Sequence, residues 1–362
     1  MENKRKYGLD IVRILAMVLI TAIHFVAYSG IMQVPHLTDY NRVLLSVVSA
    51  LFTPAVNLFV LITGYFSCEK KLNGKRLFSL WIQVFSVGLV LTAVGALFLK
   101  QPFGIVTLLK TVFPLSTMHY WFFTMYILLM LFSPLINLFI NALTQQQHKW
   151  LCIAGFFVIC VFFVSNPFFN AQYYVADARG FVWLCYIYML GAGFKKYGWE
   201  LSRKKSLLGI CLAWGALTVL KFFQMDQIAS AKFLDGNSVL PFLFSLFLFF
   251  FFKSIEIKAS VGQKLISWLS SCSFLVYVLQ EHDMIREWYW HLFNIPRYAD
   301  SPGLILTLLL SLLALWPIAL LLQWLFRLIT PFIDALYEKG SALVRKALSV
   351  WKKKTTKGTT DH

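Results

Sequence analysis

Charged residues are scarce in this sequence, and acidic ones are the scarcest. Only 14% of the 362 residues are charged, and the 33 basic residues outnumber the 16 acidic ones, for a formal net charge of +17. Ordinary soluble domains are about 25% charged, and disordered chains are poor in apolar residues. The composition is 59% hydrophobic and 17% aromatic, which excludes both classes and indicates a membrane protein.

The sequence also lacks the patterns that link cysteine to disulfides or metals. Its 6 cysteines, at positions 68, 152, 160, 185, 211 and 272, include no CxxC pair and no paired metal-ligand spacing. We therefore predict neither a disulfide framework nor a metal site, and no resident cofactor. No internal repeat and no long polar stretch is evident, which argues against a transporter built from duplicated halves and against a separate soluble domain.

Long apolar runs dominate the chain instead. A run of about 18 residues or more can cross a hydrocarbon core of about 30 Å as a helix. Ten candidates lie at 9–29, 43–66, 77–99, 119–140, 149–167, 179–196, 206–224, 237–254, 265–290 and 303–328. We predict an all-α, polytopic membrane helix bundle over residues 1–330, with about ten transmembrane helices, followed by a basic tail over residues 331–362.

The basic residues are distributed unevenly between the connecting segments. If the N-terminus is cytoplasmic, 24 of the 33 lysines and arginines fall on the cytoplasmic side. This follows the positive-inside rule, so we predict a multi-pass protein of the plasma membrane with both termini cytoplasmic. It also explains the positive charge without nucleic acid, and the tail is expected to contact anionic membrane lipid.

Three polar residues interrupt the first apolar run, LDIVRILAMVLITAIHF. Arg13 and His24 are 11 residues apart, and Asp10 precedes Arg13 by 3. At 3.6 residues per turn all three leave the same helix face and form a stripe, along which Arg13 and His24 are about 16 Å apart. Each alone has a simpler explanation, with Arg13 reaching the headgroups and His24 or Asp10 lying near an interface. Together they indicate a functional path, because ionisable groups within a span are costly.

Four segments carry a family resemblance, in the family's order. LDIVRILAMVLITAIH resembles the first helix of the integral-membrane acyltransferase-3 family, with Arg, ten residues, then His. TPAVNLFVLITGYF at 53–66, HYWFFTMYILLMLFSPLINLF at 119–139 and SSCSFLVYVLQEH at 270–282 are similar to three later family segments. Thr63 replaces the family's usual Ser. The family's late histidine falls on Gln280, so either His282 or Glu281 takes that role through a local distortion, or the role is absent.

The resemblance implies transfer of an acyl group, usually acetyl, from cytoplasmic acyl-CoA to an extracytoplasmic carbohydrate hydroxyl. Arg13 would bind the donor, and Asp10 would hold Arg13 in place. His24 would take the proton of the attacking hydroxyl or carry the acyl group itself, and the sequence leaves both routes open.

Other residues are weaker candidates. Tyr65, Lys75 and Arg76, with Lys70 and Lys71, could contact the donor, although helix packing at Gly64 and the positive-inside rule explain them as well. The predicted acceptor site, at the outer helix ends, comprises His119, Trp121, Arg179, Glu281 and His282. Helix termination at the interface is the competing explanation for the last two.

The alternative function is a transporter or exporter of polysaccharide or a small substrate, which would also need polar groups inside the bundle. A receptor or structural protein would leave Arg13 and His24 unexplained. Because no esterase-like domain is fused to the bundle, the bundle either completes the transfer or passes the acyl group to a separate extracytoplasmic protein.

Overall fold

The computed structural model describes residues 5–162, 178–224 and 234–357, and these ranges contain helices and loops without a strand. The α-helices are α1 (Tyr7–Tyr28), α2 (Asp39–Phe52), α3 (Ala55–Ser67), α4 (Gly74–Leu97), α5 (Ile105–Val112), α6 (Trp121–Ala142), α7 (Gln145–Gly155), α9 (Phe181–Lys196), α10 (Arg203–Gln224), α11 (Val239–Lys253), α12 (Ser260–Glu281), α13 (Asp283–Leu292) and α14 (Gly303–Lys357). A π-helical segment, Phe156–Val161, continues α7, and short 3₁₀ turns lie at Ile31–Gln33 and Ile295–Tyr298.

Six helical stretches of the described chain are long and apolar enough to cross a membrane. They are Tyr7–Gln33, Asp39–Ser67, Gly74–Leu97, Trp121–Ala142, Arg203–Phe223 and Gly303–Lys346. The predicted all-helical membrane protein is confirmed at this level, and α11 is a shorter apolar helix of 15 residues. Part of the predicted fifth span, 163–167, lies outside the described residues.

The predicted ninth span, 265–290, is not one helix. α12 ends at Glu281, and His282 has an extended backbone with φ −65° and ψ 120°. The side chain of His282 then caps α13 by accepting a hydrogen bond from the Met284 N–H. The polar sequence at 280–283 therefore turns the chain instead of crossing an apolar layer.

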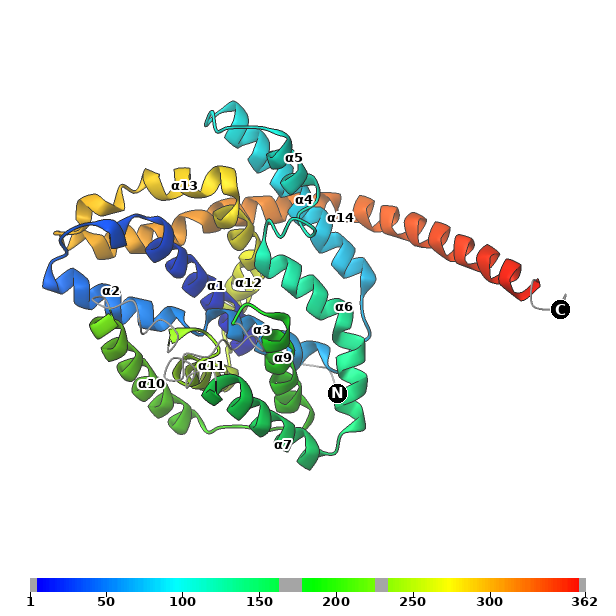
Figure 1. Ribbon diagram of the computed structural model, residues 1–362, viewed down its shortest axis with the longest axis horizontal. Helices are drawn as coiled ribbons and strands as arrows, with labels where there is room; N and C mark the ends of the chain where they lie inside the picture. The colour runs from blue at the N-terminus through cyan, green and yellow to red at the C-terminus, as the bar shows by residue number, and fades with distance from the viewer. Residues whose placement is uncertain (1–4, 163–177, 225–233, 358–362) are drawn as a thin grey trace.

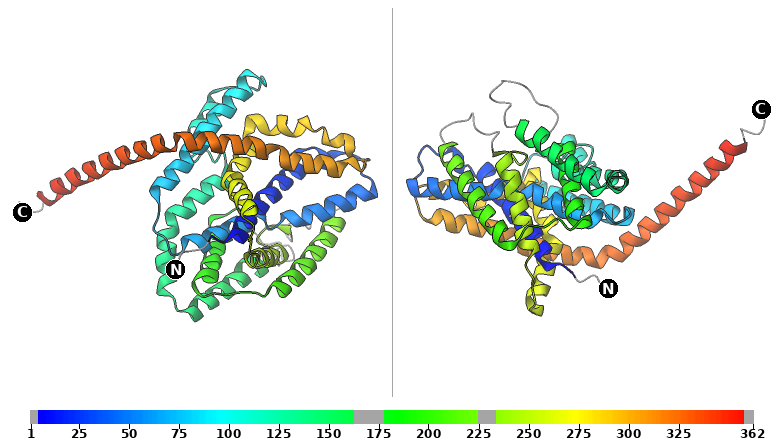
Figure 2. Two further views of the ribbon diagram at one scale, coloured as in Figure 1. Left: turned by 180° about the vertical axis from the view of Figure 1, so that it is seen from behind. Right: turned by 90° about the horizontal axis from the view of Figure 1, so that it is seen from below.

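Helix α1 lies at the centre of the bundle, against α2, α3, α11, α12, α13 and α14 (Figures 1 and 2). Its residues Leu9, Val12, Ala16 and Phe25 are fully buried. α1 and α12 run in the same direction, since Asp10 contacts Ser270 near the start of α1 and His24 contacts Glu281 near its end. This pairing presents the polar face of α1 to α12.

Helices α3 and α9 pack with their backbones in contact. A Cβ on Gly64 would collide with the carbonyl oxygen of Tyr188, and one on Gly191 would collide with that of Leu61. Small residues allow this close approach. In a membrane, such close packing stabilises helix pairs by van der Waals contact, because lipid gives no hydrophobic driving force for helices to associate. Asn137 of α6 joins both helices, since it accepts from the Tyr188 hydroxyl of α9 and donates to the Ser67 carbonyl at the end of α3.

Helix α14 is 55 residues long and continues past the bundle. It crosses the predicted domain boundary at 330/331 without a break, although Pro317 and Pro331 lie within it. Lys75 pairs with Asp334 at 3.1 Å. Beyond that contact the helix extends away from the other elements (Figures 1 and 2).

Candidate functional site

One cluster of polar groups lies near the start of α1. Asp10 accepts hydrogen bonds from Arg13 at 3.1 Å, from Ser270 at 3.0 Å and from Arg5 at 2.7 Å. Arg13 also donates to the Ser270 hydroxyl at 2.9 Å. Asp10 is 7% exposed, so its charge is compensated by two guanidinium groups within the protein. The predicted pairing of Asp10 with Arg13 is confirmed, and it fixes one edge of that guanidinium.

Arg13 borders a cavity of about 580 Å³ between α1, α3, α4, α6, α12 and α14. Its other basic lining residues are Lys70, Lys71 and Arg76, and no described lining residue is acidic. The lining also includes hydroxyl and amide side chains and the aromatic residue Phe122. A cavity of this size with four cations and no carboxylate is suited to an anionic ligand with a long polar body.

The predicted donor residues separate into two groups. Arg76 lines the cavity, together with Lys70 and Lys71. Lys75 instead pairs with Asp334 on α14 and is not part of the lining. Tyr65 is buried on another side of α3, where its hydroxyl accepts a hydrogen bond from Lys6 at 2.7 Å.

At the other end of the α1 stripe, His24 lies against Glu281. His24 Nε2 and Glu281 Oε2 are 3.1 Å apart, and both side chains are about nine-tenths buried. The two groups are within ion-pair distance, but the geometry of the contact is not that of a hydrogen bond. His24 Nδ1 has no hydrogen-bond partner among the described residues. Arg286 approaches the other carboxylate oxygen of Glu281 at 3.6 Å and covers the ring of Tyr28. The result is an imidazole beside a carboxylate, with one ring nitrogen unused.

The structure resolves the position at which the sequence departs from the family pattern. Gln280 faces α1 as well, where it donates to the sulfur of Met17 and is a side-chain neighbour of His24, and Glu281 lies 3.1 Å from the same imidazole. His282 turns the other way, where its Nε2 lies 3.2 Å from the Thr92 hydroxyl of α4. Of the two candidates, Glu281 is the neighbour of His24.

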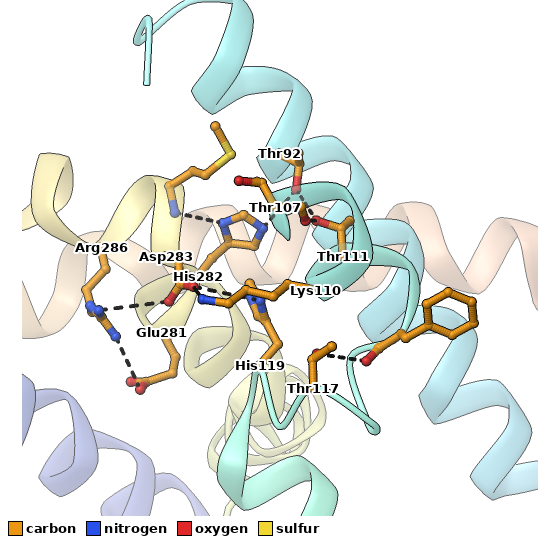
Figure 3. A network of polar contacts seen from close by, with 12 residues as sticks. Thr92, Thr107, Lys110, Thr111, Thr117, His119, Glu281, His282, Asp283 and Arg286 are labelled. Atoms are coloured by element: carbon orange, nitrogen blue, oxygen red, sulfur yellow. Dashed lines mark hydrogen bonds and ion pairs between the residues drawn. The ribbon is translucent and has the colours of Figure 1, made fainter. Parts of the chain in front are cut away.

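His282 belongs to a second polar group, which is drawn in Figure 3. Its ring lies 5.1 Å from that of His119, and Asp283 receives a hydrogen bond from Lys110 of α5 at 2.7 Å. The side chain of His119 is 2% exposed, and its two ring nitrogens have no hydrogen-bond partner among the described residues. Arg286 connects the two groups by reaching Asp283 at 3.9 Å as well as Glu281.

The predicted acceptor residues are therefore near one another but not equivalent. Glu281 faces His24, whereas His282 faces Thr92 of α4 and the ring of His119. The guanidinium of Arg179 lies 5.7 Å from the ring of Trp121, in cation–π geometry. Within the described ranges, no group of three His, Cys, Asp or Glu side chains could hold a metal ion.

Sequence reasoning missed Ser270, Lys110 and Arg286. Ser270 is the first residue of the segment noted for family resemblance, but a single Ser on a helix carries no signal by itself. Lys110 and Arg286 belong to no motif in the sequence, and the partner of Lys110, Asp283, is 173 residues away.

Fold and site together define an all-helical membrane protein with a buried polar stripe leading from a basic cavity to an imidazole–carboxylate pair. A family model for an acyltransferase domain, that of the acyltransferase-3 family, matches residues 6–327. This is nearly the whole chain, so the protein belongs to this family of membrane acyltransferases. No curated protein matches the chain, and no solved structure matches it.

Proposed function

We propose that this protein transfers an acyl group, acetyl in the simplest case, from cytoplasmic acyl-CoA to a hydroxyl of an extracytoplasmic or membrane-linked carbohydrate such as an exopolysaccharide or cell-wall glycan. The observation that carries this proposal is the polar face of α1. It has Arg13 on the basic cavity at one end and His24 beside Glu281 about three turns further along.

The basic cavity is the proposed donor site. Acyl-CoA carries several phosphates on a long flexible body, and Lys70, Lys71 and Arg76 lie together on the lining. Arg13, held by Asp10 and Ser270, presents a fixed fork of donors to a phosphate or to the thioester carbonyl. The size of the cavity and its lack of acidic lining residues support this assignment.

His24 is the proposed general base. The acceptor hydroxyl gives its proton to the free nitrogen of His24 while its oxygen attacks the thioester carbon. The C–O bond forms, the C–S bond breaks, and the leaving thiolate takes up a proton equivalent to the one on the imidazolium, which restores neutral His24. Glu281, 3.1 Å from the other ring nitrogen, stabilises the imidazolium in this step. General-base assistance is worth about 10²–10⁴-fold in rate. An acyl-histidine intermediate would use the same residues in two steps.

The membrane arrangement that goes with this mechanism is a ten-crossing bundle of the plasma membrane. α1 and α12 run in parallel. In the proposed arrangement they belong to the first and the ninth spans, and two spans point the same way when an odd number of spans lies between them. The arginine end of the stripe would then meet cytoplasmic donor, and the histidine end the external acceptor, in agreement with the positive-inside rule.

The test compares the envelope glycans of cells that carry the wild-type protein, the His24→Ala variant or the His36→Ala variant. His36 is an exposed loop histidine and serves as the matched control. We expect mass spectrometry to detect the acyl group with the wild type and His36→Ala, and to find it absent with His24→Ala at equal membrane levels. Normal acylation in the His24→Ala variant would refute the mechanism.

The transporter alternative makes a different prediction. Sealed vesicles containing the protein would accumulate unmodified glycan without acyl-CoA, and they would do so with the His24→Ala variant as well. The proposed enzyme requires acyl-CoA and shows no such uptake.

A further inference from the structure

A second hollow lies on another side of the bundle, between α7, its π-helical extension, α9 and α11. Its volume is about 830 Å³, within the range of ligand sites, and it shares no lining residue with the basic cavity. Figure 1 shows α7, α9 and α11 together on the side of the bundle away from α4 and α13. The proposed acyl transfer does not use this hollow.

One end of this groove is polar and the rest is apolar. Gln145, Gln146 and Lys149, from the first turns of α7, line one end together with Glu200. The walls beyond are mainly aromatic and aliphatic and include Phe156, Trp199, Phe242, Leu243 and Leu246. A ligand that fits both parts needs a polar head and an apolar chain.

The polar end has a net positive charge. Glu200 accepts a hydrogen bond from Lys253 at 2.6 Å, which lowers the pKa of Glu200 and keeps its charge paired. Lys149 is exposed and has no ion pair or hydrogen bond to any other described residue. Its ammonium group is thus the unmatched charge beside the groove, flanked by two amide side chains that can donate hydrogen bonds.

This polar end lies at the same end of the bundle as Arg13 and the basic cavity. Lys253 ends α11, and the start of α1 packs against it, since a Cβ on Gly8 would collide with the carbonyl oxygen of Phe252. The apolar walls extend from there along α7 and α11 toward the middle of the bundle, to Phe156 and Phe242, whose rings lie 5.6 Å apart. The groove therefore runs along the helices, as a lipid in one leaflet does.

We propose that this groove binds one anionic phospholipid, with its phosphate on Lys149 and the amides of Gln145 and Gln146 and an acyl chain between α7 and α11. A free phosphate would leave the apolar walls exposed. A zwitterionic lipid such as phosphatidylcholine also has a phosphate, but its headgroup cation would leave the net positive charge of the polar end uncompensated. A phospholipid with net negative charge satisfies both parts of the groove.

The test is native mass spectrometry of the purified full chain in detergent, with an equimolar mixture of phosphatidylglycerol and phosphatidylcholine of identical acyl chains. Lys149→Ala removes the proposed phosphate contact and breaks no contact within the described chain. Lys204→Ala, an exposed lysine at the start of α10, is the matched control. Leu246→Trp narrows the apolar part of the groove.

We expect the wild type and Lys204→Ala to retain phosphatidylglycerol preferentially. Lys149→Ala should lower that preference about tenfold, because one charge-assisted hydrogen bond is lost. Leu246→Trp should weaken binding of both lipids. Inorganic phosphate at about 10 mM should displace neither lipid, because a single anion contact has an affinity only on the order of millimolar.

Three results would overturn the proposal. Equal binding of the two lipids would show a groove filled by any lipid. An equal loss of preference in Lys149→Ala and Lys204→Ala would show a general charge effect. Displacement by phosphate alone would show a site for a free anion. The readout is lipid binding, so it does not depend on acyl-transfer activity.

Discussion

At the scale of single residues, the most consequential feature is the carboxylate beside His24. A histidine at the position of Gln280 would have placed a second imidazole on the face of α12 that meets α1. In this chain the helix ends one residue later, and Glu281 approaches His24 to 3.1 Å instead. A carboxylate can orient an imidazole and stabilise its protonated form, which is the role that we propose for Glu281.

The Glu281→Gln variant tests this pairing. The amide keeps the shape but loses the charge, so we expect kcat for acyl transfer to fall by about 10²-fold, at the lower end of general-base effects, with little change in KM for acyl-CoA. Glu287→Gln, an exposed glutamate on α13, is the control and should behave as the wild type. An unchanged kcat in Glu281→Gln would remove Glu281 from the mechanism.

Variants of the adjacent residues Lys75 and Arg76 distinguish a specific contact with the donor from a general effect of positive charge at this end of the bundle. Arg76 lines the basic cavity, whereas Lys75 pairs with Asp334. We expect Arg76→Ala to raise KM for acyl-CoA about tenfold, the effect of losing one charge-assisted contact, and Lys75→Ala to leave KM unchanged. Steady-state kinetics in proteoliposomes checks this; similar KM values for the two variants would contradict the donor site.

At the scale of elements, backbone contact between α3 and α9 positions one wall of the basic cavity. Gly64 and Gly191 allow the two helices to approach, and α3 also contributes Thr63 and Ser67 to the lining. A change at this helix pair should therefore affect both stability and donor binding.

Replacing Gly64 with Ala should force α3 and α9 apart, since the new methyl group collides with the Tyr188 carbonyl. We expect a destabilisation of about 1–3 kcal/mol, as for other overpacked interiors. Gly215→Ala is the matched control, because a Cβ there meets nothing within 4 Å, and alanine favours the helix. Thermal unfolding followed by fluorescence-detected size exclusion compares them; a Gly64→Ala protein as stable as Gly215→Ala would show that the contact is not tight.

At the scale of the whole molecule, the proposed topology defines how the bundle lies in the membrane. The proposed ten crossings place the loop at 34–38 outside and the loop at 68–73 inside. In a cysteine-free background, we expect a membrane-impermeant maleimide to label His36→Cys in intact cells, and to label Lys71→Cys only after permeabilisation. The reverse pattern would invert the topology, and with it the sides assigned to donor and acceptor.

The sequence by itself determined the class of the protein and pointed to the residues of its candidate site. Composition and run length identified membrane helices, and the 3.6-residue period placed Asp10, Arg13 and His24 on one face, because both depend only on local chemistry and helix geometry. Only the tertiary structure decided their partners. Ser270 and Glu281 reach α1 across more than 250 residues of chain, and Lys75 and Arg76, adjacent in sequence, face different surroundings. The physical reason is that contacts between helices depend on how the helices pack. The glycine contacts of α3 with α9 and the break in α12 at His282 are examples, and the residue pattern within one segment does not specify such packing.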